Sequence, residues 1–240
     1  MGGWIDKVVR LAWLTSLLLA SFSSLAATHT PFTAHYEVYF KEWHLGQGTY
    51  SLSHQGGDLY RFSFSGAIQF LIFTDAREVS SEFVDRNNRA IPLRYQHNRT
   101  GTGSDYADSI LFDPATKKIT STVRKKVESI PYDAELLDGL VVQFQLMLDL
   151  KNGVAPLRYR VLEDLAVEEI LFEEKPAETL TISGKQYNCR VVEGSRLNGS
   201  RVTRIWFAKN LDFMPVQMAY YVNGAKRFSA EMASFSRKEG

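Results

Sequence analysis

The sequence predicts a mainly β protein in which a curved antiparallel sheet of about ten strands, a half-barrel, cups one apolar helix at about residues 138–151. Two observations lead to this prediction. From Thr33 onward, apolar side chains recur at every second position, which is typical of antiparallel strands with one buried face. One later segment breaks that period and is apolar around most of a helical circumference.

The predicted strands are clearest where the alternation is regular, at residues 34–40, 60–65, 179–183 and 216–222. Turn residues separate such segments, at 45–48, 55–58, 113–114, 183–185 and 223–224. The pair Asn223-Gly224 is the strongest hairpin signal, because both residue types tolerate the positive φ of a tight turn. The spacing of these turns favours a series of hairpins.

The predicted helix begins near Asp138 and ends before Gly153. Asp138 can accept hydrogen bonds from the first amides, and Gly153 can adopt the left-handed conformation that ends many helices. Gln145 and Asp149 fall on a narrow polar stripe, and apolar residues fill most of the rest. Because this apolar arc is too wide for a helix lying flat on one sheet, we expect a curved sheet to surround it.

Gln143 is the polar residue that points into the apolar arc of this helix. A buried amide must find hydrogen-bond partners, so the simplest expectation is a bond to a strand end or to a water molecule. The alternative is that Gln143 orients a ligand inside a cavity.

Residues 1–26 have the pattern of a cleaved secretory signal peptide, and residues 27–240 are expected to form a single β-rich domain. Lys7 and Arg10 precede an apolar run at 11–22, and small residues lead to a cut after Ala26. That run is shorter than the roughly 20 residues needed to span a bilayer. Because no cysteine stands at the cut, we expect a periplasmic protein that is neither a lipoprotein nor membrane-spanning after cleavage.

Composition argues against several function classes. Removing residues 1–26 turns the net charge of +1 to zero, which disfavours nucleic-acid binding. The single cysteine, Cys189, allows no internal disulfide and is expected to be a buried apolar residue. The five histidines lack metal-ligand spacing, and no Gly-x-Ser-x-Gly motif occurs. We therefore predict no catalytic residue, no metal and no cofactor.

Apolar side chains supply the candidate ligand-binding residues. The run at 70–73 contains four consecutive apolar residues, which predicts a strand segment buried on both faces. A groove or cavity for an acyl chain would use such positions together with the apolar face of the helix. The candidates are Phe62, Phe64, Phe70, Gln143, Phe144, Met147 and Trp206.

Short motifs follow one another in a characteristic order from about residue 36 to 235. They include Tyr36-x-Val38 followed by Gly46, Ile91-Pro92-Leu93-Arg94-Tyr95, Tyr132-Asp133 before Asp138, Ile205-Trp206-Phe207 and Met214-Pro215-Val216. This order resembles the bacterial secreted proteins grouped as domain of unknown function 3108. The resemblance implies an architecture like the half-barrel around a helix of bacterial lipoprotein carriers. It implies no catalytic residue, because no activity is established for the family.

Three functional hypotheses follow from these observations. The first is a non-enzymatic binding module that holds an apolar ligand, such as a lipid or an acyl chain, between sheet and helix. The alternative is an envelope structural or assembly protein that contacts a protein partner through a sheet edge or an aromatic patch. An envelope hydrolase has the least support, because the sequence shows no arrangement of nucleophile and base.

Overall fold

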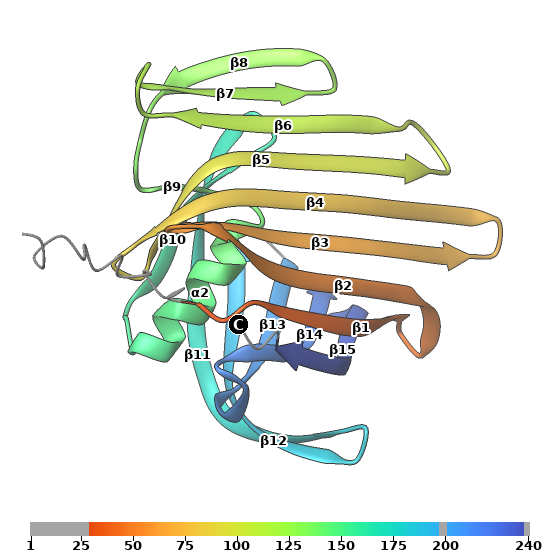
Figure 1. Ribbon diagram of the computed structural model, residues 1–240. Helices are drawn as coiled ribbons and strands as arrows, with labels where there is room; N and C mark the ends of the chain where they lie inside the picture. The colour runs from red at the N-terminus through yellow and green to blue at the C-terminus, as the bar shows by residue number, and fades with distance from the viewer. Residues whose placement is uncertain (1–28, 197–200, 238–240) are drawn as a thin grey trace, which may run out of the picture.

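A computed structural model describes residues 29–196 and 201–237, so the predicted signal peptide at residues 1–26 lies outside the described residues. The described residues form one open, curved sheet of 15 strands around one α-helix (Figure 1). The strands are β1 (Phe32–Phe40), β2 (Trp43–Gly56), β3 (Leu59–Phe70), β4 (Phe73–Arg86), β5 (Arg89–Gly101), β6 (Tyr106–Asp113), β7 (Lys118–Val123), β8 (Lys126–Pro131), β9 (Leu136–Asp138), β10 (Leu157–Glu163), β11 (Ala166–Ile182), β12 (Lys185–Arg196), β13 (Arg201–Ala208), β14 (Met214–Val222) and β15 (Ala225–Arg237). The helix α2 spans Val141–Asn152, and a 3-10 turn, η1, spans Lys209–Leu211.

The first described strand, β1, lies in the middle of the sheet, and two arms extend from it. Successive hairpins form the first arm, β1 to β8, and the chain then crosses to the opposite edge. The second arm, β9 to β15, leads back until β15 pairs with β1. The strand order is therefore β8-β7-β6-β5-β4-β3-β2-β1-β15-β14-β13-β12-β11-β10-β9.

The prediction of a mainly β, curved antiparallel sheet around one helix is confirmed, but the predicted number of about ten strands is wrong. The short strands β7, β8 and β9 contain six, six and three residues, too few to display a clear alternation. The pair β9 and β10 is also parallel, which the sequence did not predict. A helix connects these two strands, as parallel neighbours require a crossover.

Both predicted helix boundaries have the expected chemistry. The helix begins at Val141 and not near Asp138, which is the last residue of β9. Asp138 Oδ1 still accepts hydrogen bonds from the backbone N–H groups of Leu140 and Val141 at 2.9 and 2.8 Å. Gly153 follows the helix with a left-handed φ of 69°. The capping roles predicted for Asp138 and Gly153 are therefore confirmed.

A chain of buried and partly buried hydrogen bonds, which we call the helix network, joins α2 to both arms. Gln145 Oε1 accepts the N–H of Ala90 at 2.8 Å, and Gln145 Nε2 donates to the Asn88 carbonyl at 3.0 Å. Gln145 Nε2 also donates to Asp149 Oδ1 at 2.9 Å. The Tyr159 hydroxyl donates to Asp149 Oδ2 at 2.7 Å. The network therefore runs from the β4–β5 turn through α2 to β10.

The buried amide that the sequence predicts at Gln143 is found at Gln145 instead. Gln145 is 1% exposed and bonds a strand end, whereas Gln143 is half-buried. The Nε2 of Gln143 lies 3.4 Å from the Gly139 carbonyl, one turn earlier. Helical periodicity placed Gln145 on the polar stripe, but that stripe faces the strand ends and not water.

The main core fills the space between α2 and the sheet. Phe144 of the helix contacts Phe62 and Phe83 of the first arm, with ring centroids 5.7 and 5.0 Å apart. A second cluster, the seam cluster, joins the two open ends of the sheet. It consists of Ile110, Phe112, Ile119, Leu136 and Leu162, contributed by β6, β7, β9 and β10. Side-chain packing thus closes the seam without backbone pairing between β8 and β9.

We predict that Gln145→Ala lowers the free energy of unfolding by about 1–3 kcal/mol, because the buried N–H of Ala90 and the partly buried carbonyl of Asn88 lose their partner. Gln143→Ala is the matched control on the same helix and should change it by less than about 1 kcal/mol. Urea unfolding followed by circular dichroism measures both. Equal losses in the two variants would contradict the structural role of the helix network.

Candidate functional site

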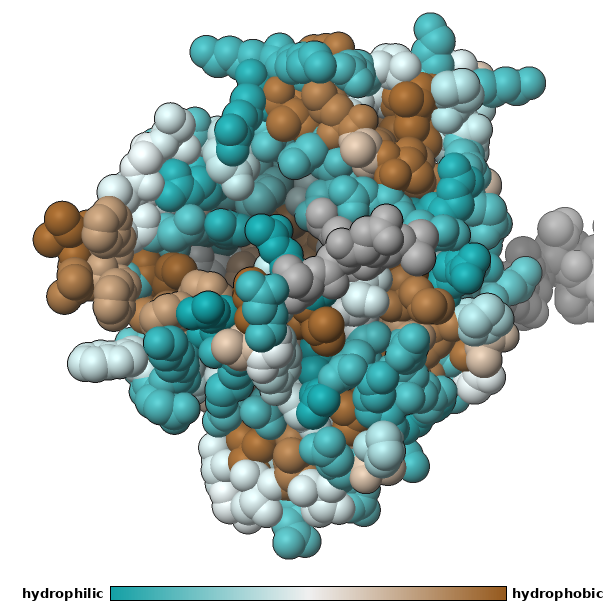
Figure 2. Space-filling model, turned by 180° about the vertical axis from the view of Figure 1, so that it is seen from behind, coloured by the Kyte–Doolittle hydropathy of each residue, from teal (hydrophilic) through white to brown (hydrophobic). Residues whose placement is uncertain are grey.

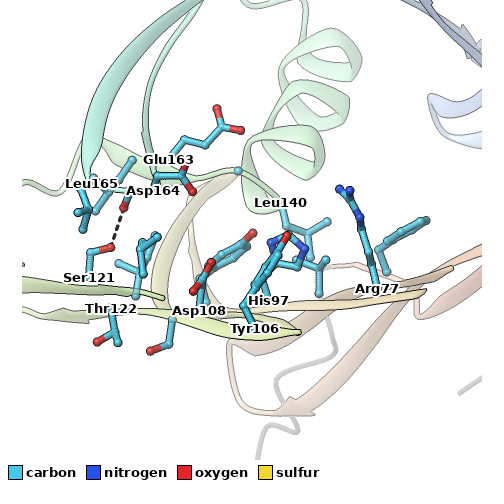
Figure 3. A pocket seen from close by; sticks show the side chains of 18 of the residues that line it. Arg77, His97, Tyr106, Asp108, Ser121, Thr122, Leu140, Glu163, Asp164 and Leu165 are labelled. Carbon is cyan, nitrogen blue, oxygen red and sulfur yellow. Dashed lines mark hydrogen bonds between the residues drawn. The ribbon is translucent and has the colours of Figure 1, made fainter. Parts of the chain in front are cut away.

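A cavity of about 610 Å³, the main cavity, lies between the start of α2 and the first arm. Its walls come from strands β2 to β7, from the residues around the helix N-terminus and from the β10–β11 turn. Figure 3 shows the side chains of the first arm facing Glu163, Asp164 and Leu165 of that turn. The volume lies within the range of about 300–1,000 Å³ that is typical of small-molecule sites.

The inner wall of the main cavity is largely apolar. Tyr50 and Phe64 contact each other with ring centroids 4.7 Å apart. Val79, Ile110 and Leu140 continue this wall along β4, β6 and the start of α2. Alternation places these strand side chains on the inner face of the curved sheet.

Two glycines shape the wall near Phe64. A Cβ on Gly48 would lie 2.8 Å from the Phe64 ring, and a Cβ on Gly66 would lie 2.7 Å from it. Such distances are too short for real contacts, so side chains at these positions would push the ring away. The glycines thus allow the Phe64 ring to lie flat against the sheet.

Polar side chains of β5 and β6 occupy the wall level with Val79, and Arg77 and Tyr106 lie nearer the ends of the strands. His97 of β5 lies opposite Val79 of β4 and Asp108 of β6 in the strand register. Its Nε2 atom is buried and has no hydrogen-bond partner among the described residues. Burial and the neighbouring Arg77 lower the pKa of His97, so the ring is neutral at neutral pH. A neutral ring nitrogen can donate to or accept from a ligand, depending on its tautomer.

The main cavity continues into an open hollow at the sheet end, and we call this passage the mouth. The outer hollow has a volume of about 860 Å³ and shares Arg77, Tyr106 and Arg124 with the main cavity. Arg77 Nε and Arg99 Nε donate to the two oxygens of Asp75 at 2.7 and 3.1 Å. These hydrogen bonds lower the pKa of Asp75 against the opposing effect of burial.

The remaining charged groups brace the loops around the mouth. Arg99 donates to the carbonyls of Ser104 and Thr102 at 3.0 and 2.6 Å, which holds the β5–β6 loop. The backbone N–H of Arg124 donates to Asp108 Oδ1 at 2.7 Å. Charges of both signs therefore surround the mouth and mainly position its backbone.

The structure brings only two of the seven predicted ligand-binding residues to the main cavity, Phe64 and Gln143. Phe62 and Phe144 contact each other in the main core. Met147 lies at a hollow of about 130 Å³ nearer the other end of α2. Whether any of these residues binds a ligand stays a prediction.

Phe70 and Trp206 lie elsewhere. Trp206 is buried in the core of the second arm, and its indole N–H donates to Glu178 Oε2 at 2.8 Å. Phe70 is 43% exposed at the end of β3. The prediction of two-sided burial at residues 70–73 is wrong, because the β3–β4 turn falls at Leu71 and Ile72.

The sequence did not single out the polar lining, above all Arg77, His97, Tyr106 and Asp108. The available signal was their position on alternate residues of three strands, β4, β5 and β6, in register with apolar inner-face residues. Each residue by itself resembles a solvated strand end, so only the register brings the four together.

Cys189 is buried as predicted, with 1% of its surface exposed. Burial raises the pKa of its thiol to about 11, so the sulfur is protonated at neutral pH.

No cluster of three or more His, Cys, Asp or Glu side chains suited to a metal ion occurs within 29–196 and 201–237. In the same ranges, no helix is long and apolar enough to cross a membrane.

Comparisons with known proteins find a family and a fold. The sequence profile of the family described as "Protein of unknown function (DUF3108)" matches residues 35–228. No curated protein matches the chain.

Two solved structures are similar to the chain. A β-barrel-like protein of domain of unknown function DUF1849 from Brucella abortus aligns with a TM-score of 0.61 at 8% identity, covering 89% of this chain and 100% of that one. A Bacteroides fragilis protein with a YmcC-like fold covers 88% of this chain and 97% of its own at 9% identity, with a TM-score of 0.34. At such identities, the first likeness concerns the fold alone, and the second is too weak to support an argument.

Asp138 directly precedes Gly139, which lines the main cavity, and it is fully buried. Its Oδ2 accepts a hydrogen bond from Ser81 Oγ at 2.5 Å. Burial raises the pKa of Asp138 to about 6, although hydrogen bonds from Ser81, Val141 and Leu140 act in the opposite direction. The folded protein therefore binds a proton at Asp138 more tightly than the unfolded chain does.

We predict that this proton makes stability depend on pH. Because the folded pKa of about 6 exceeds the unfolded value of 3.8, the stabilisation is complete below the unfolded value and is lost as the pH rises through about 6. The free energy of unfolding should fall by about 3 kcal/mol over that range relative to Asp138→Asn, which cannot titrate. Urea midpoints between pH 4 and pH 7 measure the difference.

Asp138→Ala separates the charge from the capping role. It removes both cap hydrogen bonds and the partner of Ser81, so it should be less stable than Asp138→Asn by about 1–3 kcal/mol at every pH. If wild type and Asp138→Asn have parallel pH profiles, Asp138 does not titrate in this range.

Proposed function

The chain belongs to the family described as protein of unknown function (DUF3108), and from this premise we propose that it is a non-enzymatic periplasmic binding module. Its ligand is a lipid or another molecule with an acyl chain and a polar end. The observation that carries the proposal is the main cavity of about 610 Å³, which has an apolar inner wall and a polar mouth.

The polarity of the wall changes along the main cavity in the way that an amphiphile requires. Val79, Ile110 and Leu140 supply apolar surface, where an acyl chain gains free energy by leaving water, and the first two lie further from the strand ends than Arg77 and Tyr106. Tyr106 and Arg77 lie at the mouth, because they line both the main cavity and the outer hollow. His97 lies beside Val79 in the strand register and has an unpaired Nε2, where a hydroxyl or an ester group of a ligand would supply the missing hydrogen bond.

The contacts of the polar side chains favour binding over catalysis. Asp75 is engaged by two arginines, and Asp108 holds the backbone N–H of Arg124. A general base needs an oxygen or nitrogen that is poised to take a proton. These carboxylates instead act as braces, and the protonated thiol of Cys189 lies in the core.

The alternative of an assembly protein that acts through a sheet edge has less support. The open edge strand β8 is only six residues long and has Lys126 at one end and Pro131 at the other. Short edges with lysine and proline are features by which natural sheets limit pairing with other chains. The cavity therefore supports the binding module better than β8 supports an assembly role.

We predict that Val79→Trp lowers the affinity for an acyl ligand about tenfold or more, because the larger side chain fills the inner part of the main cavity. The matched control is Glu78→Trp, at the adjacent exposed position on the opposite face of the same strand, and it should retain the affinity. Binding is measured by titration with a fluorescent fatty acid.

Native mass spectrometry of the gently purified protein tests the proposal independently. We expect a fraction of the protein to carry a bound amphiphile that organic solvent releases. A wild-type protein that carries no such molecule and takes up no acyl probe would refute the proposed function.

A further inference from the structure

The turn between β3 and β4 ends in an apolar tip, defined as Phe70, Leu71, Ile72 and Phe73. Their exposed fractions are 43%, 76%, 83% and 57%. Figure 2 shows a hydrophobic knob at the left edge of the molecule, on the side where the half-turn from Figure 1 brings the β3–β4 hairpin. Contiguous exposed apolar side chains commonly mark a site of interaction.

Local turn chemistry does not account for the apolar tip. Leu71 has a left-handed φ of 55°, a conformation that favours Gly, Asn or Asp. The other two-residue turns between described strands each contain a polar residue or glycine: Lys41-Glu42, Gly57-Asp58, Asn87-Asn88, Arg124-Lys125, Asp164-Leu165, Ser183-Gly184 and Asn223-Gly224. Leucine and isoleucine therefore occupy a turn in which the backbone conformation favours glycine, asparagine or aspartate. Such departures from local preference commonly occur at functional positions.

Aromatic residues extend the apolar surface at the base of the apolar tip. The Phe40 ring lies 6.4 Å from that of Phe70 and 5.2 Å from that of Phe228. Trp43, which pairs with Phe40 in the β1–β2 hairpin, is 68% exposed. The apolar surface thus spans the ends of three neighbouring hairpins.

Basic residues lie beside this surface. The Lys41 ammonium is 5.7 Å from the Phe40 ring, and Lys226 and Arg227 directly precede Phe228. Glu42 is the acidic residue of the β1–β2 turn. These three cations and one anion give the base of the tip a positive charge.

We propose that the apolar tip inserts into the interfacial layer of a lipid bilayer that carries anionic headgroups. Leucine, isoleucine and aromatic side chains are stabilised at the boundary of headgroups and acyl chains, and nearby lysine and arginine are attracted to the negative surface. The shape also favours a bilayer, because four residues on a convex turn present little surface compared with the roughly 800 Å² per partner of a stable protein interface.

Membrane docking would bring the mouth of the main cavity to the bilayer. The backbone N–H of Thr74 donates to Thr102 Oγ1 at 3.0 Å, and the N–H of Thr102 donates to the Thr74 carbonyl at 2.8 Å. These bonds join the β3–β4 hairpin to the β5–β6 loop, which borders the mouth. Docking does not require a filled cavity, so it can be tested separately from the proposed function.

Vesicle flotation tests the proposal. The sample is the processed chain, verified by intact mass, because the apolar run at residues 11–22 would bind vesicles by itself. We expect binding to vesicles of phosphatidylethanolamine and phosphatidylglycerol, and binding reduced about tenfold or more with phosphatidylcholine alone or at high salt.

The decisive variant is Leu71→Asn with Ile72→Gly, which installs the dipeptide of the β14–β15 turn and suits the left-handed φ. It should keep the fold and reduce vesicle binding about tenfold or more. The matched control is Val154→Ser, which removes a 44% exposed apolar side chain just after α2 and should leave binding unchanged.

Three results would overturn docking: no binding by wild type, equal binding by the tip variant, or sedimentation showing that the apolar tip instead joins two copies of the chain. If the tip variant loses vesicle binding but takes up the acyl probe as wild type does, the result supports docking and leaves the cavity proposal standing. Vesicle binding by a protein that takes up no probe would refute only the cavity proposal.

Discussion

The helix network is the constraint on which the rest of the structure depends. The two arms share backbone pairing only where β1 meets β15, and their far edges, β8 and β9, do not pair. Gln145 bonds the β4–β5 turn on one side, and Asp149 bonds Tyr159 of β10 on the other. Because these hydrogen bonds are directional and are buried or partly buried, they fix the rotation of α2 about its axis. That rotation places Leu140 and Gln143 on the main cavity and Phe144 in the core.

Much of the fold could be predicted because its main signals are local. Alternation identifies long strands, and Asp138 and Gly153 carry the chemistry of helix ends in their own side chain and backbone. The strand number could not be predicted, because three-residue and six-residue strands show almost no periodicity. Periodicity also cannot tell a polar stripe that faces water from one that faces strand ends, so Gln145 was not recognised as the buried amide.

The candidate site was less predictable because it depends on register between strands. His97 and Asp108 become neighbours through pairing of β5 with β6, and Arg77 joins them through β4. At residues 70–73 the sequence was misleading for a different reason. An apolar run normally indicates burial, and Leu71 and Ile72 lack the glycine or asparagine that marks a tight turn. The place where the local rule fails is the apolar tip, as expected if exposure there serves a function.

Two routes could admit a ligand to the main cavity, the seam between the arms and the mouth at the sheet end. The seam is closed by Ile119 and Leu136, both almost fully buried, and by the hydrogen bond of 2.7 Å from Ser121 Oγ to the Asp164 carbonyl. Opening it would expose side chains whose burial contributes about 1.5–3 kcal/mol each. Opening the mouth requires rotation of the exposed side chains of Arg77 and Arg124. The rotation of Arg77 breaks its ion pair with Asp75, and a surface ion pair of this kind contributes about 0–1 kcal/mol. Exchange of the proposed ligand therefore favours the mouth, at the end of the molecule that carries the apolar tip.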